Sequence, residues 1–189
     1  MDNNNSGKKL DIIDEILDWL ETLVLYCFIA LLLFSFVFKL VIVDGDSMLP
    51  TLENGQRLIV SNLFYTPKNG DIIIFNNENP RLNKTLVKRV IATEGQTISI
   101  DFNNGIVKVD GEVIDEPYIK DATKVPENFD TFYTKNSDGS VTVPEGYVFV
   151  MGDNRMNSTD SRSSAVGFVS VDSIIGRTIF RLYPFTRFK

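Results

Sequence analysis

The segment LVLYCFIALLLFSFVFKLVIV, residues Leu23–Val43, determines the architecture of this chain of 189 residues. Its 21 residues carry a single charge, Lys39. At about 1.5 Å per residue, a helix of this length crosses the roughly 30 Å of hydrocarbon in a bilayer. Lys39 lies near the C-terminal end, where its side chain can reach the interface. The run is longer than the apolar part of a cleaved leader and no small-x-small site follows it, so the sequence predicts an uncleaved transmembrane signal anchor.

Residues 1–22 are predicted to form a segment with an amphipathic helix that lies on one side of the membrane. Four apolar residues recur there at helical spacing, Ile13, Ile16, Leu17 and Leu20. Trp19 falls where an interfacial aromatic is expected. Lys8 and Lys9 favour a cytoplasmic N-terminus, because the acidic residues that follow count little in the positive-inside rule. Residues 44–189 would then form an extracytoplasmic domain.

Beyond residue 44 the pattern changes to short β-rich runs separated by turn signals such as Asn69-Gly70 and Asp110-Gly111. The predicted strands are Arg57–Val60, Asp71–Phe75, Thr85–Ala92, Thr97–Phe102, Ile106–Val109, Tyr147–Met151 and Ser173–Leu182. No apolar period of 3.6 runs long enough for a second sizeable helix. The expected fold is therefore mainly β, with an antiparallel β-sheet domain. Residues 103–143 are rich in polar and turn residues and are predicted to form a small inserted β subdomain.

Composition excludes several classes of function. The formal net charge is -6 and no basic stripe appears, so we expect no nucleic acid partner. The chain has no histidine and one cysteine, Cys27, which argues against a zinc or iron site and prevents an intrachain disulfide. We expect no metal and no cofactor.

Ser47 is the first candidate for chemistry, within Gly45-Asp46-Ser47-Met48-Leu49-Pro50-Thr51-Leu52. A serine nucleophile needs a base, and imidazole is absent from this chain. The base would have to be a lysine made neutral by burial, or a carboxylate. The alternative is a serine that only forms or caps a turn.

Lys88 is the candidate base. In Leu86-Val87-Lys88-Arg89-Val90, period two puts Lys88 on one face with Leu86 and Val90. Burial there would lower the pKa of the amine, so that it could accept a proton near neutral pH. The alternative is an edge lysine whose charged end reaches solvent.

A third element is the polar loop that runs from Gly152 to Arg162, GDNRMNSTDSR. An EF-hand type calcium loop is disfavoured, because Arg155 stands where an oxygen ligand should fall. One interpretation is a surface loop pinned by ion pairs. The other has Ser158 orienting the lysine amine, while Asp160 pairs with Arg162 or Arg155.

Together these elements resemble type I signal peptidases, particularly the small form of Gram-positive bacteria. The anchor, Gly70-Asp71-Ile72-Ile73-Ile74-Phe75, Glu116-Pro117-Tyr118 and the late Gly176 strand also match, so the resemblance covers nearly the whole chain. It implies that Ser47 is the acylating nucleophile and Lys88 its general base. Ser158 would position the lysine, and the supporting residues would be Asp153, Arg155, Asp160 and Arg162. The backbone N–H of Ser47 would suit the nearest oxyanion contact.

The sequence departs from the family's pattern at Gly45. Some Gram-negative members have a serine there as a second oxyanion donor, so a backbone or water donor would have to replace it. The resemblance further implies cleavage of signal peptides from secreted preproteins, with small side chains favoured at the first and third positions before the cut. Shallow pockets for them are predicted from Val43, Met48, Leu52 and Val87.

The implied setting is a single-pass protein of the bacterial cell membrane, with the lipid bilayer, preprotein signal peptides and the secretion translocon as partners. Two other functions are compatible with parts of the chain. A self-cleaving repressor-type peptidase shares a Ser–Lys dyad, but carries a DNA-binding domain where this chain has an apolar span. A non-catalytic membrane-anchored β module would not need Ser47, Lys88 and Ser158 together.

Overall fold

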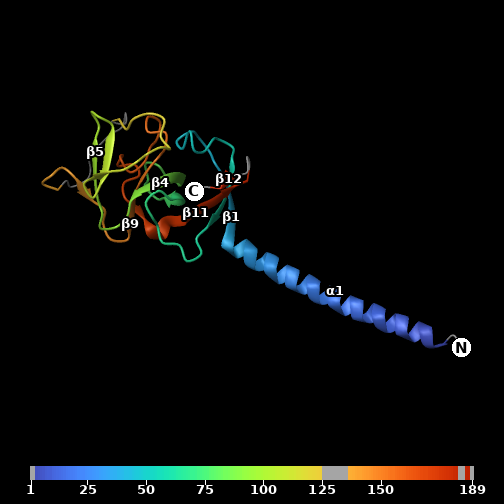
Figure 1. The fold of residues 1–189 in the computed structure, drawn as a ribbon. Helices are drawn as coiled ribbons and strands as arrows, with labels where there is room; N and C mark the ends of the chain where they lie inside the picture. Colours follow the sequence, from blue (N-terminus) through green and yellow to red (C-terminus); the bar gives the residue numbers. More distant parts are fainter. Residues whose placement is uncertain (1–2, 125–135, 183–185, 188–189) are drawn as a thin grey trace. The chain divides into compact units, whose positions relative to one another are not determined.

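The computed structural model describes residues 3–124, 136–182 and 186–187, which fall into two units that divide between Phe38 and Lys39. The first unit is dominated by helix α1 (Asn3–Val37). One continuous helix therefore covers the predicted amphipathic segment and most of the predicted span (Figure 1). Residues Glu15–Val37 are long and apolar enough to cross a membrane.

The helix is shorter than the predicted span, which was expected to run to Val43. The helix stops at Val37, and the next residues form strand β1 (Phe38–Ile42). This segment, FKLVI, is rich in aromatic and β-branched residues that favour an extended backbone. Pairing with β2 (Arg57–Ser61) gives these residues sheet hydrogen bonds, which an apolar pattern alone does not reveal.

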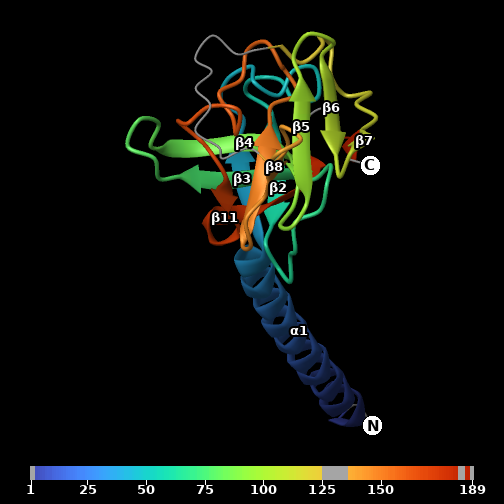
Figure 2. The ribbon, with the colours of Figure 1, turned by 90° about the vertical axis from the view of Figure 1, so that its left-hand side faces the viewer.

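The second unit contains a large sheet. Among the described residues its strand order is β1-β2-β11-β3-β4-β9-β10, with β12 paired to β11 (Figure 2). The remaining strands are β3 (Ile72–Asn77), β4 (Lys84–Ala92), β9 (Tyr147–Met151), β10 (Val169–Ser170), β11 (Ile174–Arg181) and β12 (Thr186–Arg187). The registered pairs are antiparallel. A short 3-10 helix, η1 (Val171–Ser173), precedes β11.

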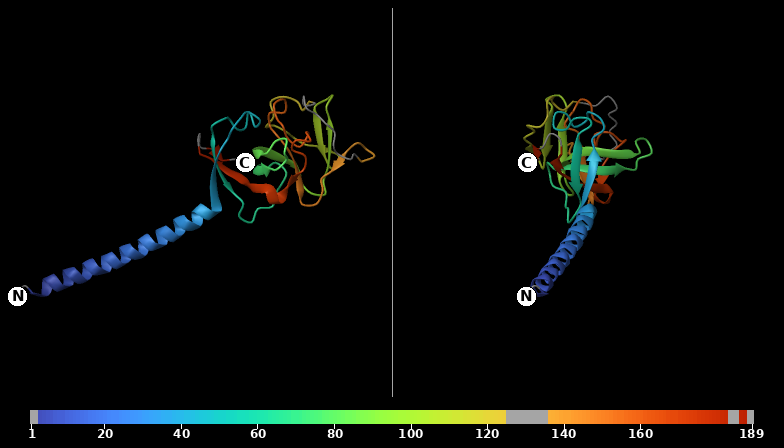
Figure 3. Two further views of the ribbon diagram at one scale, coloured as in Figure 1. Left: turned by 180° about the vertical axis from the view of Figure 1, so that it is seen from behind. Right: turned by 90° about the vertical axis from the view of Figure 1, so that its right-hand side faces the viewer.

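A second sheet corresponds to the predicted inserted subdomain. Its order is β7-β6-β5-β8, from β5 (Thr97–Asp101), β6 (Ile106–Val109), β7 (Glu112–Val113) and β8 (Val141–Thr142). These strands are labelled in Figure 2, and Figure 3 shows the yellow-green pair β5 and β6 from two further sides. The subdomain starts at Thr97, earlier than the predicted residue 103, because β5 belongs to this sheet. Residues 125–135 of the predicted insertion lie outside the described residues.

The mainly antiparallel β fold is confirmed, and each of the seven predicted strands overlaps an observed one. Three apolar clusters form the core. One lies between β3, β4 and β9 and includes Ile73 and Val90; a second joins β4 and β9 to the small sheet. The third contains Val43, Met48 and Leu52, packed with β2 and β3. This third cluster fixes the turn that carries Ser47.

Candidate active site

Ser47 lies in a turn that is held from both sides. Met48 is 1% exposed and packs into the core below the turn. On the other side, Asn154 N–H donates to the Ser47 carbonyl and its side-chain amide donates to the Asp46 carbonyl, each at 3.0 Å. Gly45 has a φ of 98°, a conformation that favours glycine, and its N–H donates to Asn54 Oδ1. The loop after β9 therefore sets the position of the Ser47 backbone.

Lys88 lies in β4 opposite Ile73 of β3 and is 2% exposed. Its Nζ lies 2.7 Å from Ser47 Oγ and donates to the Val87 carbonyl at 3.0 Å. Burial lowers the pKa of the Lys88 amine to about 8. The carboxylates of Asp160 and Asp153 oppose this shift, whereas the positive charges of Lys84 and Arg162 add to it. The sequence-based expectation that Lys88 is buried on the face it shares with Leu86 and Val90 matches the structure.

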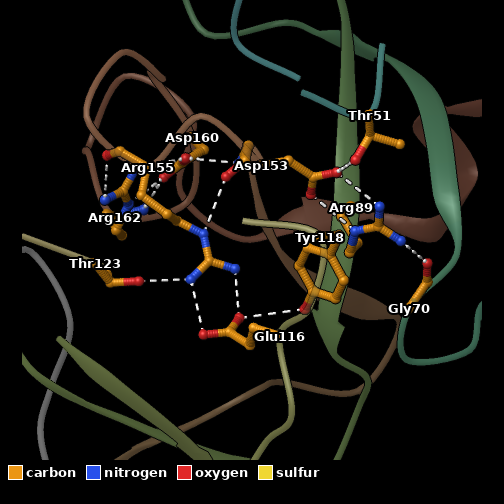
Figure 4. Close-up of polar contacts among 11 residues, drawn as sticks. Thr51, Gly70, Arg89, Glu116, Tyr118, Thr123, Asp153, Arg155, Asp160 and Arg162 are labelled. Carbon is orange, nitrogen blue, oxygen red and sulfur yellow. Dashed lines mark hydrogen bonds and ion pairs between the residues drawn. The ribbon is translucent and has the colours of Figure 1, made fainter. Parts of the chain in front are cut away.

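Arg89, the next residue of β4, binds Asp153 from the opposite face of the strand. Its guanidinium makes two contacts with the Asp153 carboxylate, at 2.8 and 2.7 Å, and donates to the Gly70 carbonyl at 2.8 Å. Asp153 also accepts a hydrogen bond from Thr51 of the Ser47 turn (Figure 4). Asp153 therefore joins the strand that carries Lys88 to the turn that carries Ser47.

The structure resolves the partner of Asp160, which the sequence left open between two arginines. Arg162 contacts Asp160 through Nε and Nη2, at 2.8 and 2.9 Å, and both side chains are fully buried. Burial alone would raise the pKa of Asp160, but the Arg162 charge and hydrogen bonds from Arg162 and Gly152 N–H hold it below its usual value. The carboxylate stays ionised deep in the domain.

Arg155 pairs instead with Glu116, and it also donates to Thr123 and to the Gly152 carbonyl (Figure 4). Tyr118, two residues after Glu116, lies under the Arg89 guanidinium, 3.9 Å from its centroid to Arg89 Cζ. Sequence reasoning did not assign roles to Arg89 or Glu116. The signals were the position of Arg89 beside Lys88 and the Glu-Pro-Tyr match, but neither shows a contact between distant segments.

Ser158 and Gly152 pack against the Ser47 turn. A Cβ added to Gly152 would lie 2.2 Å from Ser158 Oγ and 2.5 Å from the Ser47 carbonyl oxygen. Ser158 Oγ is buried and makes no hydrogen bond. It lies close enough to Asp160 to help lower the pKa of that carboxylate, but the geometry falls short of a hydrogen bond. The predicted Ser158–Lys88 contact is thus absent here, although Ser158 is at the site.

A cleft of about 480 Å³ opens beside the dyad. Its walls come from residues 40–44 after the helix and residues 84–88 of β4, with Ser47 and Lys88 both in the lining. Three of the predicted specificity residues line it, Val43, Met48 and Val87. Leu52 does not: it has no exposed surface and is part of the core, so the prediction of direct substrate contact by Leu52 is wrong. Its apolar character serves packing beneath the turn.

A serine hydroxyl 2.7 Å from the amine of a buried lysine, beside a cleft in an antiparallel β domain, is an arrangement suited to nucleophilic catalysis by serine. The comparison with protein families identifies a peptidase family. The family model described as signal peptidase, peptidase S26, matches residues 16–183. The chain belongs to this family.

Its relatives include bacterial proteins. The chain is 36% identical over 176 residues to signal peptidase I T of Bacillus subtilis, covering 92% of this chain and 88% of that protein. It is 36% identical to signal peptidase I S of the same organism, covering 100% and 98%. It is 42% identical to a probable signal peptidase I-1 of Synechocystis, covering 84% and 78%. A solved signal peptidase I of Enterococcus faecalis is 32% identical, with a TM-score of 0.45 over 60% of this chain and 97% of that one.

Proposed function

We propose that this chain is a membrane-anchored serine endopeptidase that removes signal peptides from secreted preproteins, with Ser47 as nucleophile and neutral Lys88 as general base. The observation that supports the mechanism is the 2.7 Å separation of Lys88 Nζ and Ser47 Oγ at a buried amine. The chain has no histidine to take the role of Lys88.

Acylation begins with the neutral amine. When Lys88 is deprotonated, its lone pair can accept the hydrogen bond of the Ser47 hydroxyl across the same short contact. Lys88 takes that proton as Ser47 Oγ attacks the scissile carbonyl, and the carbonyl oxygen becomes an oxyanion near the Ser47 N–H. The Lys88 ammonium then protonates the leaving amine, the C–N bond breaks, and an ester remains on Ser47.

Deacylation repeats the sequence with water. Lys88, again neutral, accepts a proton from a water molecule that attacks the ester carbonyl. The ammonium returns that proton to Ser47 Oγ as the C–O bond breaks, which releases the signal peptide and restores the enzyme. The burial of Lys88 is needed for both acylation and deacylation, because a solvated lysine with a pKa of about 10.4 would be almost fully protonated at neutral pH.

The cleft favours an extended apolar peptide that enters beside Ser47. Val43, Met48 and Val87 leave shallow apolar walls near the nucleophile, which would admit small side chains at the first and third positions before the cut and exclude large ones. Lys84 and Asp44 also line the cleft and place opposite charges on its walls. The substrate partner on this proposal is the C-terminal part of a signal peptide.

The proposed setting is the outer face of the bacterial cytoplasmic membrane. Helix α1 supplies the one apolar span among the described residues, and the chain enters the β domain two residues later at Lys39. Tethering would hold Ser47 near the surface where cleavage sites of translocated precursors emerge, and this raises the local concentration of substrate. The secretion translocon would be a neighbour in that setting, with the N-terminus of the chain in the cytoplasm.

The test uses the full chain in detergent with a secretory precursor. Ser47→Ala should abolish cleavage, and so should Lys88→Ala. Lys88→Arg should be equally inactive, because a guanidinium stays protonated in proteins. A matched control is Lys68→Arg, on a surface loop away from the cleft. Substantial cleavage by Lys88→Arg would contradict the lysine-base mechanism, and cleavage by Ser47→Ala would contradict the acyl-enzyme.

A further inference from the structure

The active-site cleft runs between two strands that point in the same direction. Val43 N–H donates to the Gln56 carbonyl at 2.9 Å, and β1 ends just before this contact while β2 begins just after it. The two strands are neighbours in the sheet, so they must run antiparallel. β2 is antiparallel to β11, β11 to β3, and β3 to β4. β1 and β4 therefore run the same way, β1 towards the turn that carries Ser47 and β4 towards Lys88.

The cleft extends from the dyad back towards the starts of these two strands. Residues 40–44 line one wall and residues 84–88 the other, and the lining includes no residue of β4 beyond Lys88. Lys84, at the start of β4, therefore marks the far end of the cleft. Four residues of strand separate Lys84 from Lys88, a length of about 13 Å. A peptide whose reacting carbonyl lies at Ser47 would fill the cleft on one side of the scissile bond.

The proposed function puts the residues before the cut on that side, because the shallow apolar walls near Ser47 suit their small side chains. An extended peptide advances by about 3.3 Å per residue, as the strand beside it does. When the first residue before the cut lies at the dyad, the fifth residue before the cut lies beside Lys84. The first, third and fifth side chains also point to the same side of an extended chain.

Lys84 supplies the charge at this end of the cleft. The other charged residues of the lining are Lys88 at the dyad and Asp44, three residues before Ser47 on the opposite wall. Lys84 is exposed, and no carboxylate among the described residues forms an ion pair with it. Its field extends along the wall, because its charge helps to lower the pKa of Lys88. An unpaired ammonium group on the wall of a peptide cleft attracts acidic side chains and repels basic ones.

We propose that Lys84 sets a charge preference at the fifth residue before the cut, where it favours acidic side chains and disfavours basic ones. This rests on the proposed function, since it takes the same cleft as the binding site of the signal peptide. The contact is remote from the reacting atoms and is made both before and during the reaction. It should therefore appear in KM and leave kcat nearly unchanged.

Three precursors that differ only at the fifth position before the cut, with Asp, Asn or Lys there, test the proposal on the full chain in detergent. For the native chain, kcat/KM should fall in the order Asp, Asn, Lys, by about 2- to 10-fold from first to last, as expected for an exposed charge pair and its repulsive counterpart. The ratio should shrink at high salt, which screens exposed charges.

Lys84→Glu should reverse the order of the three precursors, and Lys84→Gln should remove it. Ratios between precursors on one variant cancel the effect of Lys84 on the pKa of Lys88, because all three precursors share it. The matched control is Lys108→Glu. Lys108 is exposed in β6 of the small sheet, and its replacement changes the net charge equally, so the native order should persist.

Three results would overturn the inference and leave the proposed function standing, provided that Ser47→Ala stays inactive. They are equal efficiencies for the three precursors, an order that Lys84→Glu does not change, and a dependence on Lys84 only for charges placed at the fifth residue after the cut. The last result would mean that the mature part of the precursor fills the cleft. Cleavage by Ser47→Ala, or failure of the native chain to cleave any precursor, would overturn the proposed function and this inference with it.

Discussion

Gly152 lies so close to Ser47 that a Cβ at position 152 would stand 2.5 Å from the Ser47 carbonyl oxygen. The same atom would lie 2.2 Å from Ser158 Oγ. Real Cβ contacts are not that short, so any side chain here must displace the nucleophile turn, Ser158 or the loop itself. The smallest residue at this position is therefore a geometric requirement of the site.

Gly152→Ala should accordingly reduce turnover by about 100-fold or more, because displacements of about 1 Å in reacting groups cost that much. It should also lower the free energy of unfolding, as overpacking does, by roughly 1–3 kcal/mol. The measurement is precursor cleavage per folded molecule. Gly105→Ala is the control: in the turn between β5 and β6 of the small sheet its Cβ would meet the Ala122 Cβ at 2.6 Å, so it should cost stability and leave specific activity intact. Equal specific activity in both variants would refute the requirement.

Ser158→Ala separates two roles for the hydroxyl. Because Ser158 Oγ is buried without a hydrogen bond to any described residue, while it also favours the ionised Asp160, its removal should change the free energy of unfolding by less than about 1 kcal/mol. If the hydroxyl orients the Lys88 amine during the reaction, turnover should still fall by roughly 10- to 1000-fold with little change in KM. Stability from thermal unfolding and turnover from precursor cleavage are compared on one preparation. Unchanged turnover would leave Ser158 as a packing residue.

The burial of Lys88 should also make the free energy of unfolding depend on pH. The pKa of Lys88 falls from 10.5 to about 8 on folding, so the unfolded chain binds the proton more tightly. Below pH 8 this opposes folding by roughly 3 kcal/mol, at 1.36 kcal/mol per pKa unit. The penalty declines as the pH rises from 8 to 10.5 and is absent above that range.

Lys88→Met removes the titrating group and keeps an apolar stem. Its unfolding free energy should exceed that of the native chain below pH 8, and the difference should shrink as the pH rises to 10.5. Denaturant unfolding at several pH values, with native chain and variant in the same detergent, gives that difference directly. A difference in unfolding free energy that does not change with pH would mean that folding does not lower the pKa of Lys88.

Much of this site could be read from the sequence, because its signals are local. Alternation along β4 placed Lys88 on an apolar face, and the absence of histidine made that lysine the leading base. The apolar helix followed from the length of one apolar run. Its end at Val37 did not, because the apolar character of FKLVI fits either a helix or a strand and only pairing with β2 decides between them.

The contacts that hold the site together were not readable in the same way. Arg89 meets Asp153 across 64 residues of sequence, and Arg155 meets Glu116 across 39, and nothing in either local pattern names its partner. Leu52 was misassigned for a related reason: apolar residues near a nucleophile can line a pocket or support it from below, and only packing distinguishes the two. The requirement for glycine at position 152 comes from its neighbours in space, Ser47 and Ser158, and a sequence does not show these contacts.

The pH dependence of kcat/KM tests the central claim most directly, namely that Lys88 is the base. The efficiency should rise with pH along an acidic limb centred near 8, the pKa of the buried amine. Lys84→Gln should move that limb upward, because the Lys84 charge lowers the pKa of Lys88. Asp46 is the carboxylate nearest in sequence that could compete as base. Because the limb belongs to Lys88, Asp46→Asn should leave it in place. A limb at about pH 4 to 5, or efficiency lost in Asp46→Asn with Lys88 intact, would contradict the account.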